Sequence, residues 1–135
     1  MNVLTTGTDS GKIDWGEGYK GRTQDLLLPE HREQAYKNHL QINNNQYKHL
    51  FPVCKWFSLT NSKYKYLICS IDQENPDIAW AIIDLGGGYV EFADISINEV
   101  SDFQHPIYKI HDFERDIIWK PKKTIGGYLK KRQIR

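Results

Sequence analysis

A continuous apolar run, Ile78 to Ile83, is the clearest hydrophobic feature of the chain. It follows an acidic stretch, Asp72 to Asp77, and is followed by three glycines, Gly86 to Gly88. The run is too short for a globular helix, whereas a strand covered on both faces has this length. The glycines let the backbone turn where a side chain would forbid it. The pattern therefore predicts the central strand of a small sheet, with Trp80 in the core.

Neighbouring segments share the β-branched and aromatic character of a strand. Together with the apolar run they predict four strands, at residues 52–60, 64–71, 78–85 and 89–95. The connections are short, and parallel pairs need longer crossovers, so the strands should form an antiparallel meander. Before them, residues 29–41 predict a helix with Pro29 in its first turn and an apolar stripe of Ala35, Tyr36 and Leu40.

The C-terminal part of the chain predicts shorter elements. The segment Ser96-Ile97-Asn98-Glu99 is a capping box, which predicts a helix running to about Phe103. Residues 107–110 and 117–120 predict one or two further strands, and residues 124–132 a terminal helix that Gly126 and Gly127 weaken. The expected fold class is α+β: an antiparallel meander sheet of four or more strands, an N-terminal helix and short C-terminal helices.

The first 25 residues differ from the rest of the chain. They hold five of its ten glycines, and their only aromatic side chains are Trp15 and Tyr19. They predict a weakly ordered, Gly-rich arm, residues 1–25, ahead of a single α+β domain, residues 26–135, that ends in a basic tail.

Composition restricts the class of protein. At 135 residues and 15.8 kDa the chain is long enough for one domain with a real core. No apolar run approaches the roughly 20 residues of a membrane helix, and no signal-peptide pattern opens the sequence. We therefore expect a cytoplasmic protein that does not enter a membrane.

The chain has two cysteines, Cys54 and Cys69, too few for a disulfide framework or a zinc site by themselves. A hairpin turning at Asn61-Ser62 would set them opposite each other on neighbouring strands. We expect both to be reduced and buried.

The net charge of +1 conceals a strong separation of charge. Residues 72–116 hold eleven acidic residues against two basic ones, Lys109 and Arg115, and so carry −9. The last sixteen residues, Lys120 to Arg135, hold seven basic residues and no acidic one. Such a separation concerns partners rather than fold.

Several side chains have the chemistry of a metal or catalytic site. Carboxylates that a metal-dependent hydrolase would use are Asp72, Glu74, Asp77, Asp84 and Glu91. However, Asp and Asn are turn residues, and Asp72 and Asp84 should lie at opposite ends of their strands, which argues against a shared ion. His105, His111, Asp112 and Asp116 match no zinc spacing, and the cysteines match no nucleophile signature. We expect no metal and no cofactor.

The basic tail is a candidate nucleic-acid contact, because its lysines and arginines could contact phosphates and Trp119 and Tyr128 could stack on bases.

Five ordered motifs carry a resemblance to a known family. They are Phe51-Pro52-Val53 with Trp56-Phe57, Asp72 to Ala79, Asp84 to Gly88, Ile95 to Glu99, and Glu114-Arg115-Asp116 with Trp119-Lys120-Pro121. This series resembles bacterial domain-of-unknown-function family 2958 over roughly residues 26 to 130. Its members are small proteins of plasmids, conjugative elements and other mobile DNA. The resemblance supplies no enzymatic activity and no catalytic residues, and the Gly-rich arm departs from the family's short N-terminus.

The resemblance implies an accessory protein of mobile DNA. The leading hypothesis is a non-enzymatic binding protein that inhibits a host defence nuclease or CRISPR complex, because an acidic surface competes for the Lys and Arg that grip DNA. Its partner would be a protein with a basic surface, bound through Asp72, Glu74, Asp77, Glu91 and Asp94. The alternatives are a metal-dependent enzyme acting on nucleic acid, and a nucleic-acid-binding accessory of plasmid transfer or maintenance. The oligomeric state stays open.

Overall fold

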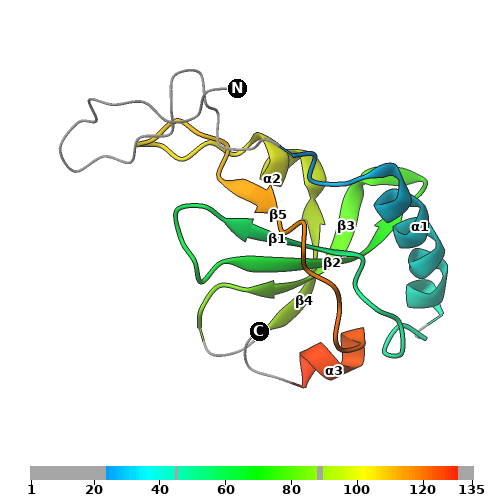
Figure 1. The fold of residues 1–135 in the computed structure, drawn as a ribbon. Coiled ribbons are helices and arrows are strands. Elements are labelled where there is room, and N and C mark those ends of the chain that lie inside the picture. Colours follow the sequence, from blue (N-terminus) through cyan, green and yellow to red (C-terminus); the bar gives the residue numbers. More distant parts are fainter. Residues whose placement is uncertain (1–23, 45, 88–89, 131–135) are drawn as a thin grey trace.

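The computed structural model describes residues 24–44, 46–87 and 90–130, which form an antiparallel sheet and the helices around it (Figure 1). The strands are β1 (Cys54–Ser58), β2 (Lys65–Asp72), β3 (Asn75–Asp84), β4 (Glu91–Ser96) and β5 (Phe113–Arg115). Their order in the sheet is β4-β3-β2-β1-β5, so the first four form the predicted meander. The α+β prediction is confirmed. The predicted arm lies outside the described residues except for residues 24 and 25.

β5 lies between the two segments that were predicted as further strands, so the predictions at residues 107–110 and 117–120 were wrong. Each segment begins in an exposed turn: Ile107 is 73% exposed, Ile117 62% and Ile118 86%, whereas Ile110 is buried outside any strand. The short strand between them instead buries Phe113 and Arg115, and it pairs with the free edge of β1. The strand prediction was based on these isoleucines, but the described part of the fold provides no neighbouring strand against which they could pack.

The helices are α1 (Pro29–Asn43), α2 (Ile97–Asp102) and α3 (Ile125–Leu129). Each lies where the sequence predicted a helix. The Ser96 hydroxyl accepts a hydrogen bond from the Glu99 amide at the start of α2, as expected of an N-cap. Gly126 does more than weaken α3: a Cβ there would lie 2.9 Å from the Lys48 carbonyl oxygen, so glycine allows α3 to approach that loop.

The apolar stripe predicted for α1 is only partly correct. Ala35 is fully buried, but Leu40 is 65% exposed, and Asn38 is buried in its place. The Asn38 side-chain amide donates hydrogen bonds to the Cys69 carbonyl (2.9 Å) and the Phe51 carbonyl (3.2 Å). α1 is therefore docked on the sheet by a polar contact as well as by apolar packing.

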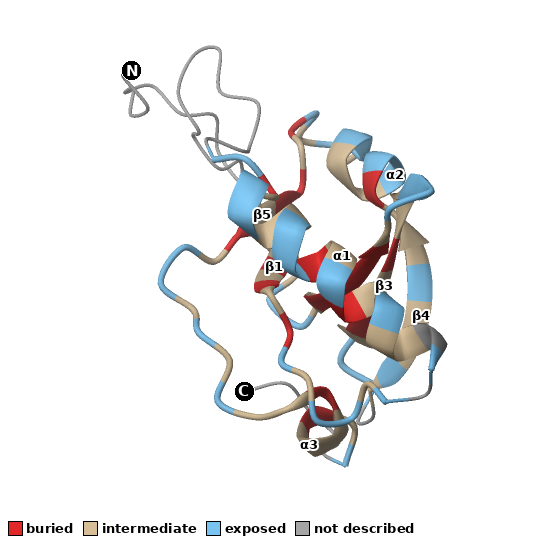
Figure 2. Ribbon diagram, turned by 90° about the vertical axis from the view of Figure 1, so that its right-hand side faces the viewer, coloured by how far each residue is buried: buried red, intermediate tan, exposed pale blue. Residues whose placement is uncertain are grey.

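The sheet has a core on each face. α1 lies across one face (Figures 1 and 2), where the core includes Trp56, Ile68, Ile71, Ala79 and Ala81. On the opposite face, residues from β2 and β3 pack with α3, in a core of Leu67, Cys69, Ile82, Ile125 and Tyr128. β3 contributes to both cores and is thus covered on both faces, as predicted for the central apolar run.

Two predictions about individual side chains were wrong. Trp80 is only half-buried, whereas Trp56 is fully buried and its indole N–H donates to the Leu26 carbonyl at 2.8 Å. Cys54 pairs with Ile68 rather than with Cys69, so the two cysteines lie in the cores on opposite faces of the sheet. A one-residue shift of register moves a side chain to the other face. Both thiols are buried and free.

Candidate functional site

A groove lies beside the turn between β2 and β3, with a volume of about 550 Å³. Asp72, Gln73, Glu74 and Asn75 line it from the turn, and Tyr36, His39 and Leu40 line it from α1. Ile78 and Trp80 of β3 and Asp94 of β4 complete it. We call this the acidic groove, because it has three carboxylates and no lysine or arginine among its lining residues.

Local backbone geometry places these carboxylates together. The turn consists of Gln73 and Glu74, since Asp72 pairs directly with Asn75. The Asp72 carboxylate accepts a hydrogen bond from the Glu74 amide at 2.9 Å, which fixes the turn. Asp94 pairs with Trp80 across β3 and β4, and paired residues present their side chains on the same face.

His39 of α1 faces the acidic end of this groove. Its Nε2 lies 3.9 Å from the Asp72 carboxylate, beyond hydrogen-bond distance, and the two side chains are 13% and 35% exposed. Its Nδ1 is buried without a hydrogen-bond partner. His39 thus lies beside Asp72 in the lining of the acidic groove.

The structure does not bring all five predicted partner residues together. Asp77 is not in a turn: it lies on β3, where its carboxylate accepts hydrogen bonds from the Ser96 hydroxyl at 2.5 Å and the Asn98 amide at 2.7 Å. These two bonds lower the pKa of Asp77 below its usual value and tie α2 to β3. Glu91 is exposed and pairs with Ile83, which places it on the face opposite Asp94 and outside the acidic groove.

The other carboxylates considered for a metal site are separated. Asp84 is 3% exposed, lies at the far end of β3 from Asp72, and accepts a hydrogen bond from the Gly86 amide. Asp116 lies 3.7 Å from the Lys55 ammonium group. Within residues 24–44, 46–87 and 90–130, no group of three or more His, Cys, Asp or Glu side chains is placed to hold a metal ion.

The cysteine and histidine candidates have structural roles. Burial raises the pKa of the Cys54 thiol to about 12 and also raises that of Cys69, which keeps both thiols protonated. His105 Nδ1 accepts from the amides of Ile107 and Tyr108, within the loop before β5. His111 Nδ1 lies 3.0 Å from the Ser101 carbonyl oxygen.

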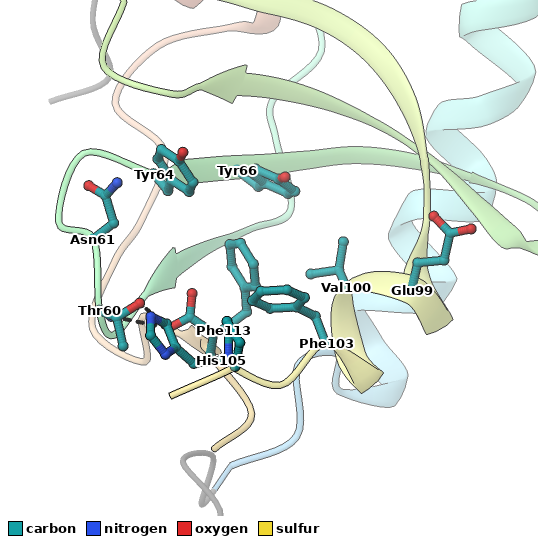
Figure 3. Close-up of a pocket in the computed structure, with 11 residues that line it drawn as sticks. Thr60, Asn61, Tyr64, Tyr66, Glu99, Val100, Phe103, His105 and Phe113 are labelled. Atoms are coloured by element: carbon teal, nitrogen blue, oxygen red, sulfur yellow. Dashed lines mark hydrogen bonds between the residues drawn. The ribbon is translucent and has the colours of Figure 1, made fainter. Parts of the chain in front are cut away.

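A second cavity, of about 600 Å³, was not predicted from the sequence (Figure 3). Its aromatic lining consists of Tyr64, Tyr66, Phe103 and Phe113, so we call it the aromatic pocket. Val100, His105 and Pro106 add to the wall, and its polar lining is Thr60, Asn61, Glu99 and Asp112. These residues come from two distant parts of the sequence, residues 60–66 and 99–113, which is why local patterns did not reveal the pocket.

Asp112 holds the polar side of the aromatic pocket in place. It is 4% exposed, and its carboxylate accepts hydrogen bonds from the Ser58 hydroxyl (2.6 Å), the Thr60 hydroxyl (2.7 Å) and the Thr60 amide (3.1 Å). Burial of a carboxylate is tolerated when donors surround it. Asp112 thereby fixes the loop after β1 against the segment that enters β5.

Comparison with known proteins gives one assignment. A family described as protein of unknown function (DUF2958) matches residues 26–134. The chain belongs to this family. Neither the curated proteins nor the solved structures contain a match. Both cavities of this DUF2958 protein lie inside the matched range.

The two aromatic residues proposed to stack with the basic tail, Trp119 and Tyr128, pack within the fold of this DUF2958 protein. Tyr128 is 2% exposed, its hydroxyl accepts a hydrogen bond from the Lys122 amide, and Lys123 lies 5.6 Å from its ring centroid. Trp119 is half-buried and packs against the same core. Stacking of a nucleic-acid base on Tyr128 would require α3 to detach. Residues 131–135 of the tail lie outside the described residues.

No helix among the described residues of this family member has the length and apolar character needed to cross a bilayer.

Proposed function

We propose that this protein is a non-enzymatic binding protein of mobile genetic elements that inhibits a DNA-handling defence enzyme of the host, a nuclease or a CRISPR complex. It would do so by covering a basic surface of that enzyme with the acidic groove. The observation that carries the proposal is the groove itself, whose lining contains Asp72, Glu74 and Asp94 but no lysine or arginine.

The negative charge of the acidic groove would attract a basic protein surface. An enzyme that grips DNA presents lysine and arginine, and a concave surface lined by one sign of charge attracts the opposite sign and speeds association. Like-charge repulsion would in turn keep the groove away from DNA itself. The proposed mode is therefore competition with DNA for a basic protein surface.

The groove also supplies apolar contact. Trp80 is half-buried at its wall, and Leu40 is 65% exposed at its edge. Partly exposed tryptophans often dominate the energy of protein interfaces, with charged groups around them setting specificity. Trp80 is thus the expected anchor and the three carboxylates the steering groups.

The test is a plasmid-survival assay in bacteria that carry an active CRISPR system or restriction nuclease directed against the plasmid. Expression of the parent protein should raise transformation efficiency. The variant Glu74→Lys/Asp94→Lys, which leaves the turn-fixing Asp72 in place, should lose this protection while keeping its fold.

A matched control separates the groove from net charge alone. Glu91 and Asp102 are exposed and lie outside the groove, so Glu91→Lys/Asp102→Lys changes the net charge equally. This control should protect as well as the parent. Equal protection by the groove variant, or equal loss in the control, would contradict the assignment of the groove. Absence of protection by the parent across a panel of defence systems would contradict the inhibitor function.

A further inference from the structure

We propose that the aromatic pocket is a binding site for the guanidinium group of an arginine side chain presented by a peptide segment. The inference rests on a different cavity from the acidic groove and does not depend on the function proposed for that groove.

The shape and lining of the aromatic pocket suit a flat cation. Tyr66 and Phe113 pack against each other, with 5.1 Å between their ring centroids and their planes 41° apart, and together they form one aromatic wall of the cavity (Figure 3). Phe103 is 45% exposed and lies at the end of α2, beside Phe113 in the lining (Figure 3). Ring faces attract cations, and a guanidinium group stacks on them better than an ammonium group does.

The charges around the aromatic pocket favour a cation over an anion. Glu99 lies exposed at its rim, and the buried Asp112 carboxylate contributes to its wall. No lysine or arginine lines it. The cation nearest along β5 is Arg115, which is 9% exposed and donates to the Asp25 carbonyl at 2.8 Å instead of entering the pocket. A phosphate-bearing ligand would meet two carboxylates and no counter-charge.

Acceptors at the rim match the donors of guanidinium. Its N–H groups form a rigid planar fork that binds a carboxylate through two parallel hydrogen bonds. Glu99 is one such carboxylate, held on α2 by the Ser96 cap, and the Tyr64 and Tyr66 hydroxyls are further acceptors. Burial raises the pKa of Tyr66, so its hydroxyl stays protonated and its ring neutral at physiological pH.

The test uses small probes and the full chain. N-acetyl-arginine N-methylamide is titrated while backbone amide shifts are followed by NMR. The control probe is the citrulline analogue, which keeps the shape and most hydrogen bonds of arginine but has no charge. Arginine should shift the amides of Phe103, His105 and Phe113 saturably, and citrulline should bind about tenfold more weakly or not at all.

Two matched variants locate the site. Glu99→Gln removes the rim carboxylate, whereas Asp102→Asn removes an exposed carboxylate that does not line the pocket. Phe103→Ala removes a wall that is already 45% exposed, so the fold should persist. Glu99→Gln and Phe103→Ala should each weaken arginine binding by about three- to tenfold, and Asp102→Asn should leave it unchanged.

Several outcomes would overturn the inference. Equal binding of arginine and citrulline would show that charge is irrelevant. Tighter binding of N-acetyl-leucine N-methylamide would make the cavity an apolar groove, and preference for adenosine monophosphate would make it a nucleotide site. Shifts confined to the acidic groove would place the cation there, and would leave the groove proposal intact while refuting this one.

Discussion

Substitution of Asn38 should destabilise the protein far more than its polar character suggests. The Asn38 amide donates to two carbonyl groups, those of Cys69 and Phe51. In the pairing of β2 with β3, Ile68 lies opposite Ala81 and Ser70 lies opposite Trp80, the residue next to Ala81. Cys69 therefore has no partner on β3, which is a β-bulge. Bulges of this kind disrupt the ladder locally. Asn38 supplies a donor to the bulge and fastens α1 to it at the same time.

The magnitude follows from the groups that lose a donor. A buried acceptor left unsatisfied costs about 1–3 kcal/mol, and the Phe51 bond is only partly buried, so the two together should cost about 2–4 kcal/mol. Alanine regains about 0.6 kcal/mol of helix propensity at the same position. Asn38→Ala should therefore lower the free energy of unfolding by about 1.5–3.5 kcal/mol. Asn38→Asp should lower it further at neutral pH, because a carboxylate would face two carbonyl oxygens.

The assay is equilibrium urea unfolding followed by tryptophan fluorescence, with linear extrapolation to water. The control is Gln34→Ala, which removes the bond from Gln34 Nε2 to Asn38 Oδ1 (2.9 Å) but leaves both carbonyl contacts. Gln34 is exposed, so this change should stay within about 0.5 kcal/mol of the parent. An Asn38→Ala variant as stable as Gln34→Ala would refute the bulge-anchoring role of Asn38.

Three further predictions follow from burial and pKa. Trp56→Ala should lower the free energy of unfolding by about 3–5 kcal/mol and Trp80→Ala by clearly less, because only Trp56 is fully buried; equal urea midpoints would contradict this. Cys54 and Cys69, with raised thiol pKa values, should react with Ellman's reagent at pH ~8 only after unfolding. Fast labelling of the native protein would contradict their burial. The lowered pKa of Asp77 implies a stabilising contribution that is complete above pH ~3.9 and lost as the pH falls through the folded-state value. The free energy of unfolding, measured by urea unfolding at a series of acidic pH values, should therefore fall less steeply with decreasing pH in Asp77→Asn than in the parent. Identical pH dependence in the two proteins would contradict this.

The fold was predictable where local pattern and tertiary packing agree. The apolar run in β3, the Ser96 cap of α2 and the Pro29 start of α1 each depend on neighbours in the sequence, and each lies where it was predicted. β5 was missed because its three residues carry no pattern of their own. They become a strand only because β1 offers an unpaired edge.

Side-chain placement depends on features that composition does not encode. Cys69 lies on the face opposite Cys54 because the β1–β2 hairpin pairs Cys54 with Ile68, one residue away from the expected register, and no residue of the turn signals that difference. Asn38 was overlooked because a polar residue on a helix is ordinarily exposed. The aromatic pocket was not predictable from local pattern. The tertiary fold assembles its lining from residues 60–66, 99–106 and 112–113, and the only related signal in the sequence is the high aromatic content of the chain.

The charge of −9 between residues 72 and 116 overstates the surface available to a partner, because the fold uses part of it. Asp77 caps α2, Asp84 and Asp112 are buried among hydrogen-bond donors, and Asp116 lies beside Lys55. Neutralising any of these would perturb the structure, so loss of activity in such variants would say little about binding. Glu74 and Asp94 are exposed, with no fold-stabilising side-chain contact among the described hydrogen bonds and ion pairs. Charge reversal at these positions changes the electrostatic field with little change in the fold, which makes them the informative positions for testing an electrostatic partner.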